Sequence, residues 1–186
     1  MPIIAALLVV PAEPSDPRLV AGLFWTGAVV VAVGEGLRLW AVGHIGVISR
    51  TRSDRLGPLV VSGPFSIVRN PLYIGNILLW LGLTVSARLL WLAPVVTLLL
   101  ALQYRAIVAW EEHLLALRLG DDYRQYAAHV PRWIPRMGRT RRQGSARGAG
   151  ESMAPRFSWR DTLFGERGTL AAIAAGYVLL WAKDRL

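Results

Sequence analysis

Long apolar runs, separated by short polar or basic stretches, dominate the hydropathy pattern of the chain. The runs cover residues 19–42, 71–86, 89–110 and 170–181. A helix needs about 20 mainly apolar residues to cross a bilayer, and the longer runs reach that length. The pattern therefore predicts an all-α, polytopic transmembrane protein with about five membrane helices in a single domain that covers residues 1–186.

Two of the runs should form a central helical hairpin, because only a tight turn around Arg88 separates residues 71–86 from residues 89–110. Gly75 and Gly82 lie seven positions apart on the first arm, so they share a helix face and permit close packing against a neighbour.

The first ten residues are apolar and lack a basic segment or a small-residue cleavage site. We interpret them as a retained first span and not as a signal peptide.

One pair of opposite charges interrupts the 19–42 run. Glu35 and Arg38 are three positions apart and therefore share a helix face. They could form a buried pair near a functional site, or a self-paired couple that reaches towards the membrane edge. We favour the second interpretation.

The stretch from Gly63 to Gly75 marks a helix start. Asn70 is a favoured N-cap residue, and Pro71 is tolerated at the first helical position because its missing N–H would be unpaired there. The first turn exposes backbone N–H groups at the positive end of the helix dipole, with Arg69 just outside and Tyr73 one turn inside. Such an arrangement is suited to a carboxylate or another anion.

The second arm of the hairpin returns to the membrane face at which the first arm begins. Its late residues Glu111 and Glu112 should therefore lie near Arg69. Gly120 supplies a helix stop. A short helix should follow from Asp121 until Pro131, and it would carry tyrosines three positions apart, Tyr123 and Tyr126.

Composition agrees with a membrane protein. The chain has 186 residues, 54% of them hydrophobic, with a formal charge of +9 and a mean hydropathy of +0.41. Most arginines flank apolar segments, which favours membrane lipids over nucleic acid as the partner of this charge. The basic loop around residues 50–55 should face the cytoplasm by the positive-inside rule.

Metal and thiol chemistry are not indicated. The chain contains no cysteine, and its histidines, His44, His113 and His129, are scattered without the spacing of metal ligands. We therefore expect no metal site. The oligomeric state cannot be read from the pattern.

The order of these motifs resembles a known family of integral membrane enzymes, the isoprenylcysteine carboxyl methyltransferases and the related phospholipid methyltransferases. The matching blocks are Gly63-Pro64-Phe65, Arg69-Asn70-Pro71-Leu72-Tyr73-Ile74-Gly75, the hairpin, Glu111-Glu112, Leu115, Gly120, Tyr123, Tyr126 and Val130-Pro131. The resemblance covers about residues 59–135, which would form the catalytic core. Residues 137–155 would be a flexible basic linker, and residues 156–186 an interfacial segment followed by the last helix.

The resemblance implies S-adenosylmethionine as the cofactor, bound on the cytosolic face, and a lipid or prenylated small molecule as the acceptor. Arg69 and Glu112 would be the catalytic residues. The cofactor pocket would consist of Asn70, Pro71, Tyr73, Gly75, Glu111 and Glu112, closed by Tyr126, Pro131 and Arg132. The family's prenylcysteine enzymes often have histidine where this chain has Asn70, which weakens a claim for a prenylated cysteine in particular.

The chemistry of the cofactor suits these residues. The helix start with Arg69 can hold its carboxylate, and a glutamate can accept from ribose hydroxyls or the ammonium. O-methylation of a carboxylate of isoprenylcysteine type needs no base, and Arg69 could orient that carboxylate. N-methylation of a phospholipid amine is the alternative, in which Glu112 could take the proton. A non-catalytic scaffold with the same fold is a third possibility.

Overall fold

The computed structural model describes residues 16–45, 59–135 and 157–185. Its elements in chain order are α2 (Pro17–Ile45), the 3₁₀ turn η2 (Gly63–Ser66), α3 (Pro71–Ser86), α4 (Leu92–Leu119), α5 (Asp121–His129) and α6 (Trp159–Lys183). The predicted first span, the basic loop at 50–55 and the linker at 137–155 lie outside the described residues. Within the described ranges every regular element is helical, so the predicted all-α fold class is confirmed.

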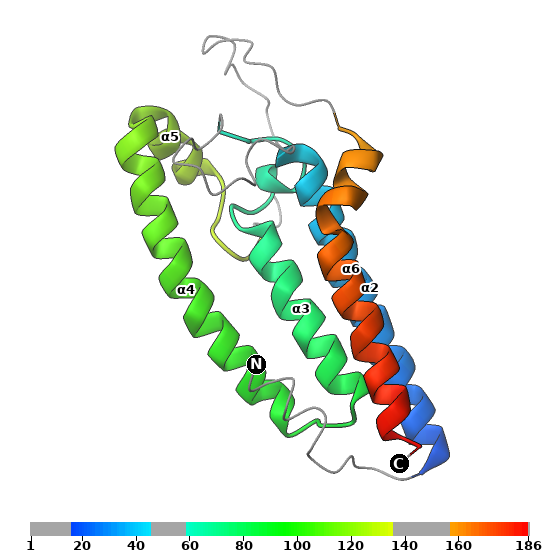
Figure 1. Ribbon diagram of the computed structural model, residues 1–186. Coiled ribbons are helices and arrows are strands. Elements are labelled where there is room, and N and C mark those ends of the chain that lie inside the picture. The colour runs from blue at the N-terminus through cyan, green and yellow to red at the C-terminus, as the bar shows by residue number, and fades with distance from the viewer. Residues whose placement is uncertain (1–15, 46–58, 136–156, 186) are drawn as a thin grey trace.

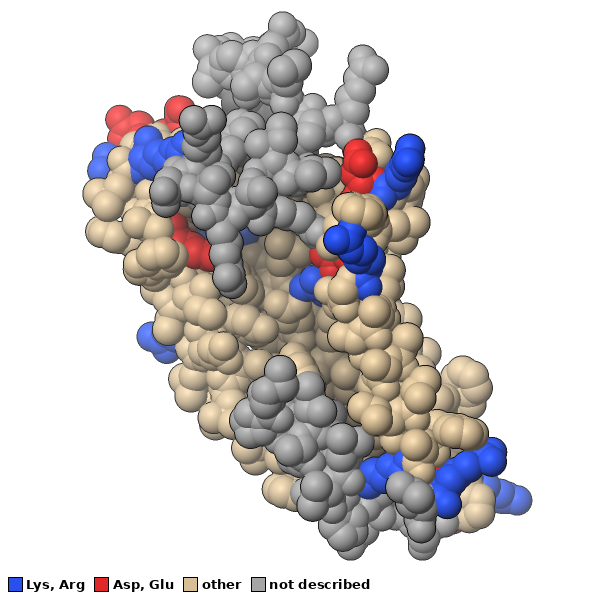
Figure 2. All heavy atoms as spheres, in the orientation of Figure 1, with Lys and Arg blue, Asp and Glu red and all other residues tan. Residues whose placement is uncertain are grey.

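Three helices have the length and composition needed to cross a membrane. They are α2 with 29 residues, α4 with 28 and α6 with 25, whereas the apolar α3 has 16. On the face shown in Figure 2, the middle of the bundle is mostly uncharged, and charged side chains gather towards its two ends. This distribution is typical of a protein that spans a bilayer.

The predicted hairpin is present. α3 ends at Ser86 and α4 begins at Leu92, and Figure 1 shows the two helices side by side, with α2 and α6 beyond α3. The turn packs inwards, since Leu89 is fully buried in a cluster with Leu92 and Val96. Consequently the start of α3 and the end of α4 lie at the same end of the bundle.

Glycines bring α2 and α3 into backbone contact. A Cβ atom built on Gly82 would lie 2.6 Å from the carbonyl oxygen of Gly27, and one on Gly34 would lie 2.9 Å from that of Gly75. Real Cβ atoms do not approach other atoms so closely. The predicted close packing at Gly75 and Gly82 is therefore confirmed, and its partner is α2.

The last helix is longer than the sequence pattern predicts. The apolar run suggests residues 170–181, but α6 begins at Trp159, where the Ser158 hydroxyl oxygen accepts a hydrogen bond from the Asp161 N–H at 3.3 Å. Charged residues in the first half of α6 lower its hydropathy and conceal the helix from a search for apolar runs. One of them, Glu166, is only 3% exposed and packs against α2.

The glycine contact predicts a position-specific effect on stability. Gly27→Ala would place a methyl group 2.2 Å from the Ser86 hydroxyl oxygen and 2.4 Å from the Gly82 carbonyl oxygen. We expect it to destabilise the protein by about 1–3 kcal/mol and to lower its melting temperature in detergent. Gly22→Ala on the same helix is the matched control, because a Cβ there has open space. Equal melting temperatures for the two variants would contradict the interface.

Candidate functional site

The start of α3 is where the sequence predicts it, but Asn70 acts differently from a conventional cap. Asn70 holds the N-cap position and Pro71 is the first helical residue, yet the Asn70 side chain makes no capping hydrogen bond. Its Nδ2 instead donates to the Arg132 carbonyl oxygen at 3.3 Å, and the Arg69 N–H donates to the Pro131 carbonyl oxygen at 2.9 Å. Both contacts attach the helix start to the segment that follows α5.

One carboxylate lies at the centre of this attachment. Glu112 Oε1 is 3.3 Å from Arg69 Nη1 and accepts from Arg132 Nε at 3.1 Å, while Glu112 Oε2 accepts from Arg132 Nη2. The Glu112 side chain is 12% exposed and that of Arg69 is 15% exposed. The hydrogen bond to Glu112 raises the pKa of the Arg132 guanidinium above its ordinary value. The predicted proximity of Arg69 and Glu112 is thus confirmed.

Glu111 contacts a tyrosine, whereas its neighbour Glu112 contacts two arginines. The Tyr73 hydroxyl, on the first turn of α3, donates to Glu111 Oε1 at 2.7 Å. The Tyr73 ring packs against the ring of Tyr104 from α4, with 4.8 Å between the centroids. Both members of the glutamate pair are therefore held at the same end of the bundle, each by its own contact with the α3 side.

Helix α5 closes over the helix start through its tyrosines. The Tyr126 hydroxyl donates to the Phe65 carbonyl oxygen in η2 at 2.7 Å, and Arg69 Nη1 donates to the Tyr123 hydroxyl at 3.4 Å. Burial raises the pKa of both phenols above the ordinary value of 10.0. These contacts explain why Tyr126 lies beside the predicted site.

Gly75, unlike the other predicted pocket residues, lies on the face of α3 that contacts α2. A Cβ atom on Gly75 would lie 2.5 Å from Arg38 Cγ and 2.8 Å from the Gly34 carbonyl oxygen. Its missing side chain therefore makes room for Arg38 of α2. The remaining predicted residues meet where α3 begins, α4 ends and α5 leads into residues 130–132.

The pair Glu35 and Arg38 is self-paired, as the favoured interpretation has it, but the pair is also shared with a neighbouring helix. Glu35 is 6% exposed and the Arg38 side chain is 13% exposed, and Glu35 Oε2 lies 3.4 Å from Arg38 Nε, so the pair lies among the helices, as the alternative interpretation of a buried pair predicts. Arg38 also contacts Asn76 of α3 and two residues of α6, Glu166 and Thr169. Sequence reasoning missed these three partners, although a polar residue inside an apolar run, such as Asn76, is a usable signal.

The residues at the α3 start fit a cofactor with a carboxylate and hydroxyl groups. Arg69 Nε is buried and makes no hydrogen bond within the described part of the chain, so a donor is available there. Arg69 and Arg132 could hold a carboxylate, and Glu111 and Glu112 could accept from hydroxyl or ammonium groups. No group of three or more histidine, aspartate or glutamate side chains that could hold a metal ion occurs among the described residues.

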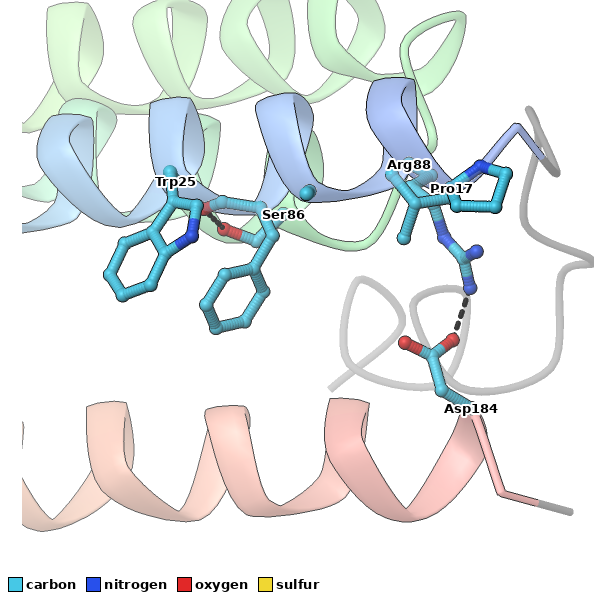
Figure 3. Close-up of a pocket in the computed structure, with 8 residues that line it drawn as sticks. Pro17, Trp25, Ser86, Arg88 and Asp184 are labelled. Carbon is cyan, nitrogen blue, oxygen red and sulfur yellow. Dashed lines mark hydrogen bonds and ion pairs between the residues drawn. The ribbon is translucent and has the colours of Figure 1, made fainter.

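A separate hollow of about 620 Å³ lies at the opposite end of the bundle (Figure 3). There Arg88 pairs with Asp184, beside Trp25 and Ser86. None of the predicted site residues lines this hollow. The candidate site is therefore the polar cluster at the α3 start and not this hollow.

Comparison with known proteins gives a family match. A family model described as phospholipid methyltransferase matches residues 23–122, which is more than half of the chain. This match confirms the resemblance inferred from the motifs. No solved structure matches the chain at a significant level.

Two curated relatives are named as metal resistance proteins. The nickel-cobalt-cadmium resistance protein NccN of Alcaligenes xylosoxydans xylosoxydans is 30% identical over 73% of this chain, and the cobalt-zinc-cadmium resistance protein CzcN of Cupriavidus metallidurans is 32% identical over 61%. The matched regions span 60% and 52% of these relatives' own lengths. The chain thus corresponds to only part of each relative.

Because tyrosines are buried at the candidate site, we expect the folded protein to become less stable at alkaline pH. Above about pH 10 a phenol ionises in the unfolded chain, whereas burial keeps the Tyr126 phenol protonated in the folded state. The unfolded state then binds fewer protons, so stability should fall as the pH rises. Melting temperatures measured between about pH 9 and about pH 11 should decline less steeply for Tyr126→Phe than for the wild type. Parallel curves for the two proteins would contradict this account.

Proposed function

We propose that this chain, which belongs to the phospholipid methyltransferase family, is a membrane methyltransferase that uses S-adenosylmethionine to methylate the polar group of a lipid-borne acceptor. Family membership supports the methyltransferase class, and the helical bundle supports its place in the membrane. One observation carries the finer proposal. The Glu112 carboxylate is held between Arg69 and Arg132 at the start of α3, beside a second glutamate.

The residues of this cluster divide the work of binding. Arg69 and Arg132 would hold the cofactor's carboxylate, helped by the positive end of the α3 dipole. Glu111 and Glu112 would accept hydrogen bonds from its ribose hydroxyls or its ammonium group. S-adenosylmethionine supplies an electrophilic methyl group when it is bound. Tyr126 would help to close the pocket by keeping α5 on η2.

Positioning and exclusion of water would provide most of the acceleration. Methyl transfer is an in-line displacement and needs no covalent enzyme intermediate. The residues of the site would align the reacting groups, and the apolar helices around them would exclude water. An acceptor anchored in the bilayer could reach the cluster without leaving the membrane.

Our first candidate for the acceptor is a carboxylate of isoprenylcysteine type, which Arg69 could orient and which needs no base. Both oxygens of Glu112 already contact guanidinium groups, which makes Glu112 less suited to take a proton. N-methylation of a phospholipid amine is the alternative, and the family's description favours it.

The basic loop at residues 50–55 supports a site that faces the cytoplasm.

The relatives' names suggest one context for the activity. Both refer to resistance to divalent metals, and both proteins are longer than the region that matches this chain. We propose that a contribution to such resistance would come through methylation of a membrane component.

The proposal predicts transfer of a labelled methyl group to a lipid-soluble product. Membranes containing the protein would be incubated with methyl-labelled S-adenosylmethionine, extracted and separated by thin-layer chromatography. Mild alkali would release the label from a methyl ester but not from a methylamine, so it distinguishes the two acceptor classes. Arg69→Ala and Glu112→Gln should each lower the rate by roughly tenfold or more, since each removes a charged hydrogen-bond partner.

Arg124→Gln is the matched control for these variants. Arg124 lies on α5 near the site, but its side chain is 72% exposed and pairs only with Asp121 in the described contacts. The control should retain the wild-type rate. If Arg69→Ala and Glu112→Gln both had the wild-type rate, neither residue would be part of the site.

A further inference from the structure

A second polar cluster lies between α2, α3 and α6, about one helical turn further along α3 than Tyr73. Arg38 of α2 forms ion pairs with Glu35 on its own helix and with Glu166 of α6, and its Nη2 also donates to Thr169 at 3.1 Å. Arg38 Nη1 donates to Asn76 Oδ1 on α3. These contacts fix the guanidinium from three helices.

The cluster continues towards the candidate site. The Asn76 side chain lies within hydrogen-bonding reach of the Tyr104 hydroxyl. Because Asn76 Oδ1 accepts from Arg38, its amide nitrogen is the group left to face Tyr104. The Tyr104 ring packs against that of Tyr73, whose hydroxyl donates to Glu111. An unbroken series of contacts therefore leads from Arg38 to the Glu111 carboxylate.

This arrangement is difficult to explain by stability alone. An arginine inside a membrane bundle is costly to bury, and a buried ion pair often contributes little net stability. What the series does provide is orientation, because each side chain restricts the rotation of the next one. At its far end, Tyr73 supplies the contact that holds Glu111 at the α3 start.

We propose that Arg38, Asn76 and Tyr104 are positioning residues that hold Tyr73, and through it Glu111, in the orientation that binds the cofactor. This inference rests on the proposed function. It also assigns a role to α6, which lies outside the family match and contributes Glu166 to the same cluster. None of the positioning residues needs to contact the cofactor.

The test measures S-adenosylmethionine binding by calorimetry with the full chain in lipid nanodiscs. Asn76→Leu removes both hydrogen bonds at similar size, and Tyr104→Phe keeps the ring but removes the hydroxyl. Tyr104→Phe should weaken binding by roughly five- to tenfold, in line with the loss of one hydrogen bond, and Asn76→Leu, which also leaves Arg38 without its acceptor on α3, should weaken it at least as much. Asn76→Asp keeps an acceptor for Arg38 but lacks the amide nitrogen that faces Tyr104, so it should bind about as weakly as Tyr104→Phe.

Tyr177→Phe is the control for a general effect on packing. In the wild type the Tyr177 hydroxyl lies 3.2 Å from Ser86 Oγ, so the variant loses a comparable helix-to-helix contact at the opposite end of the bundle. It should bind the cofactor with wild-type affinity. Wild-type affinity in both Asn76→Leu and Tyr104→Phe, or equal weakening in Tyr177→Phe, would overturn the inference.

A second readout does not depend on the cofactor. If wild-type protein fails to bind S-adenosylmethionine, the proposed function fails, but the series of contacts can still be tested by melting temperature. Tyr104→Phe, Glu111→Gln and the double variant would be compared. If the two residues are coupled, the double variant should lose less melting temperature than the sum of the losses in the two single variants. Additive losses would show that Tyr104 does not position Glu111.

Discussion

The ion pairs of Glu112 with Arg69 and Arg132 hold together the part of the structure on which the proposed function depends. Glu112 comes from the end of α4, Arg69 from the start of α3, and Arg132 from the segment after α5. These three segments can meet only because the α3–α4 hairpin returns the chain to the same end of the bundle. A mostly buried carboxylate shared by two guanidinium groups is costly to separate, since each remaining charge would lose its partner.

A second constraint acts deeper in the bundle. The small residues Gly34 and Gly75 let α2 approach α3, and the space beside Gly75 is filled by Arg38. Close packing of the helices and placement of the buried charge are therefore the same structural feature. Through Asn76 and Tyr104 this feature reaches the aromatic pair next to Glu111. The polar site and the apolar helix interface are thus physically connected.

Local signals in the sequence were sufficient for the core of the fold. Proline at the first position of α3, Gly120 after α4 and the antiparallel hairpin predict the helix bounds and the meeting of Arg69 with Glu112. The contacts of Asn70 with Arg132 and of Arg38 with Asn76 could not be predicted in this way, because no turn or hairpin in the sequence fixes how α2 and the segment after α5 pack against α3. The start of α6 was missed because the first half of this helix carries several charged residues, of which Glu166 is buried, and a hydropathy pattern shows them as a polar segment.

The central claim is that the cluster around Glu112 binds S-adenosylmethionine. Calorimetry of the purified protein in lipid nanodiscs tests it most directly, with the double variant Glu111→Gln/Glu112→Gln and the exposed control Arg124→Gln measured beside the wild type. We predict binding in the wild type and in the control, and loss of binding in a double variant that remains folded. A folded wild-type protein that does not bind, or a double variant that binds equally well, would contradict the claim and favour a non-catalytic scaffold.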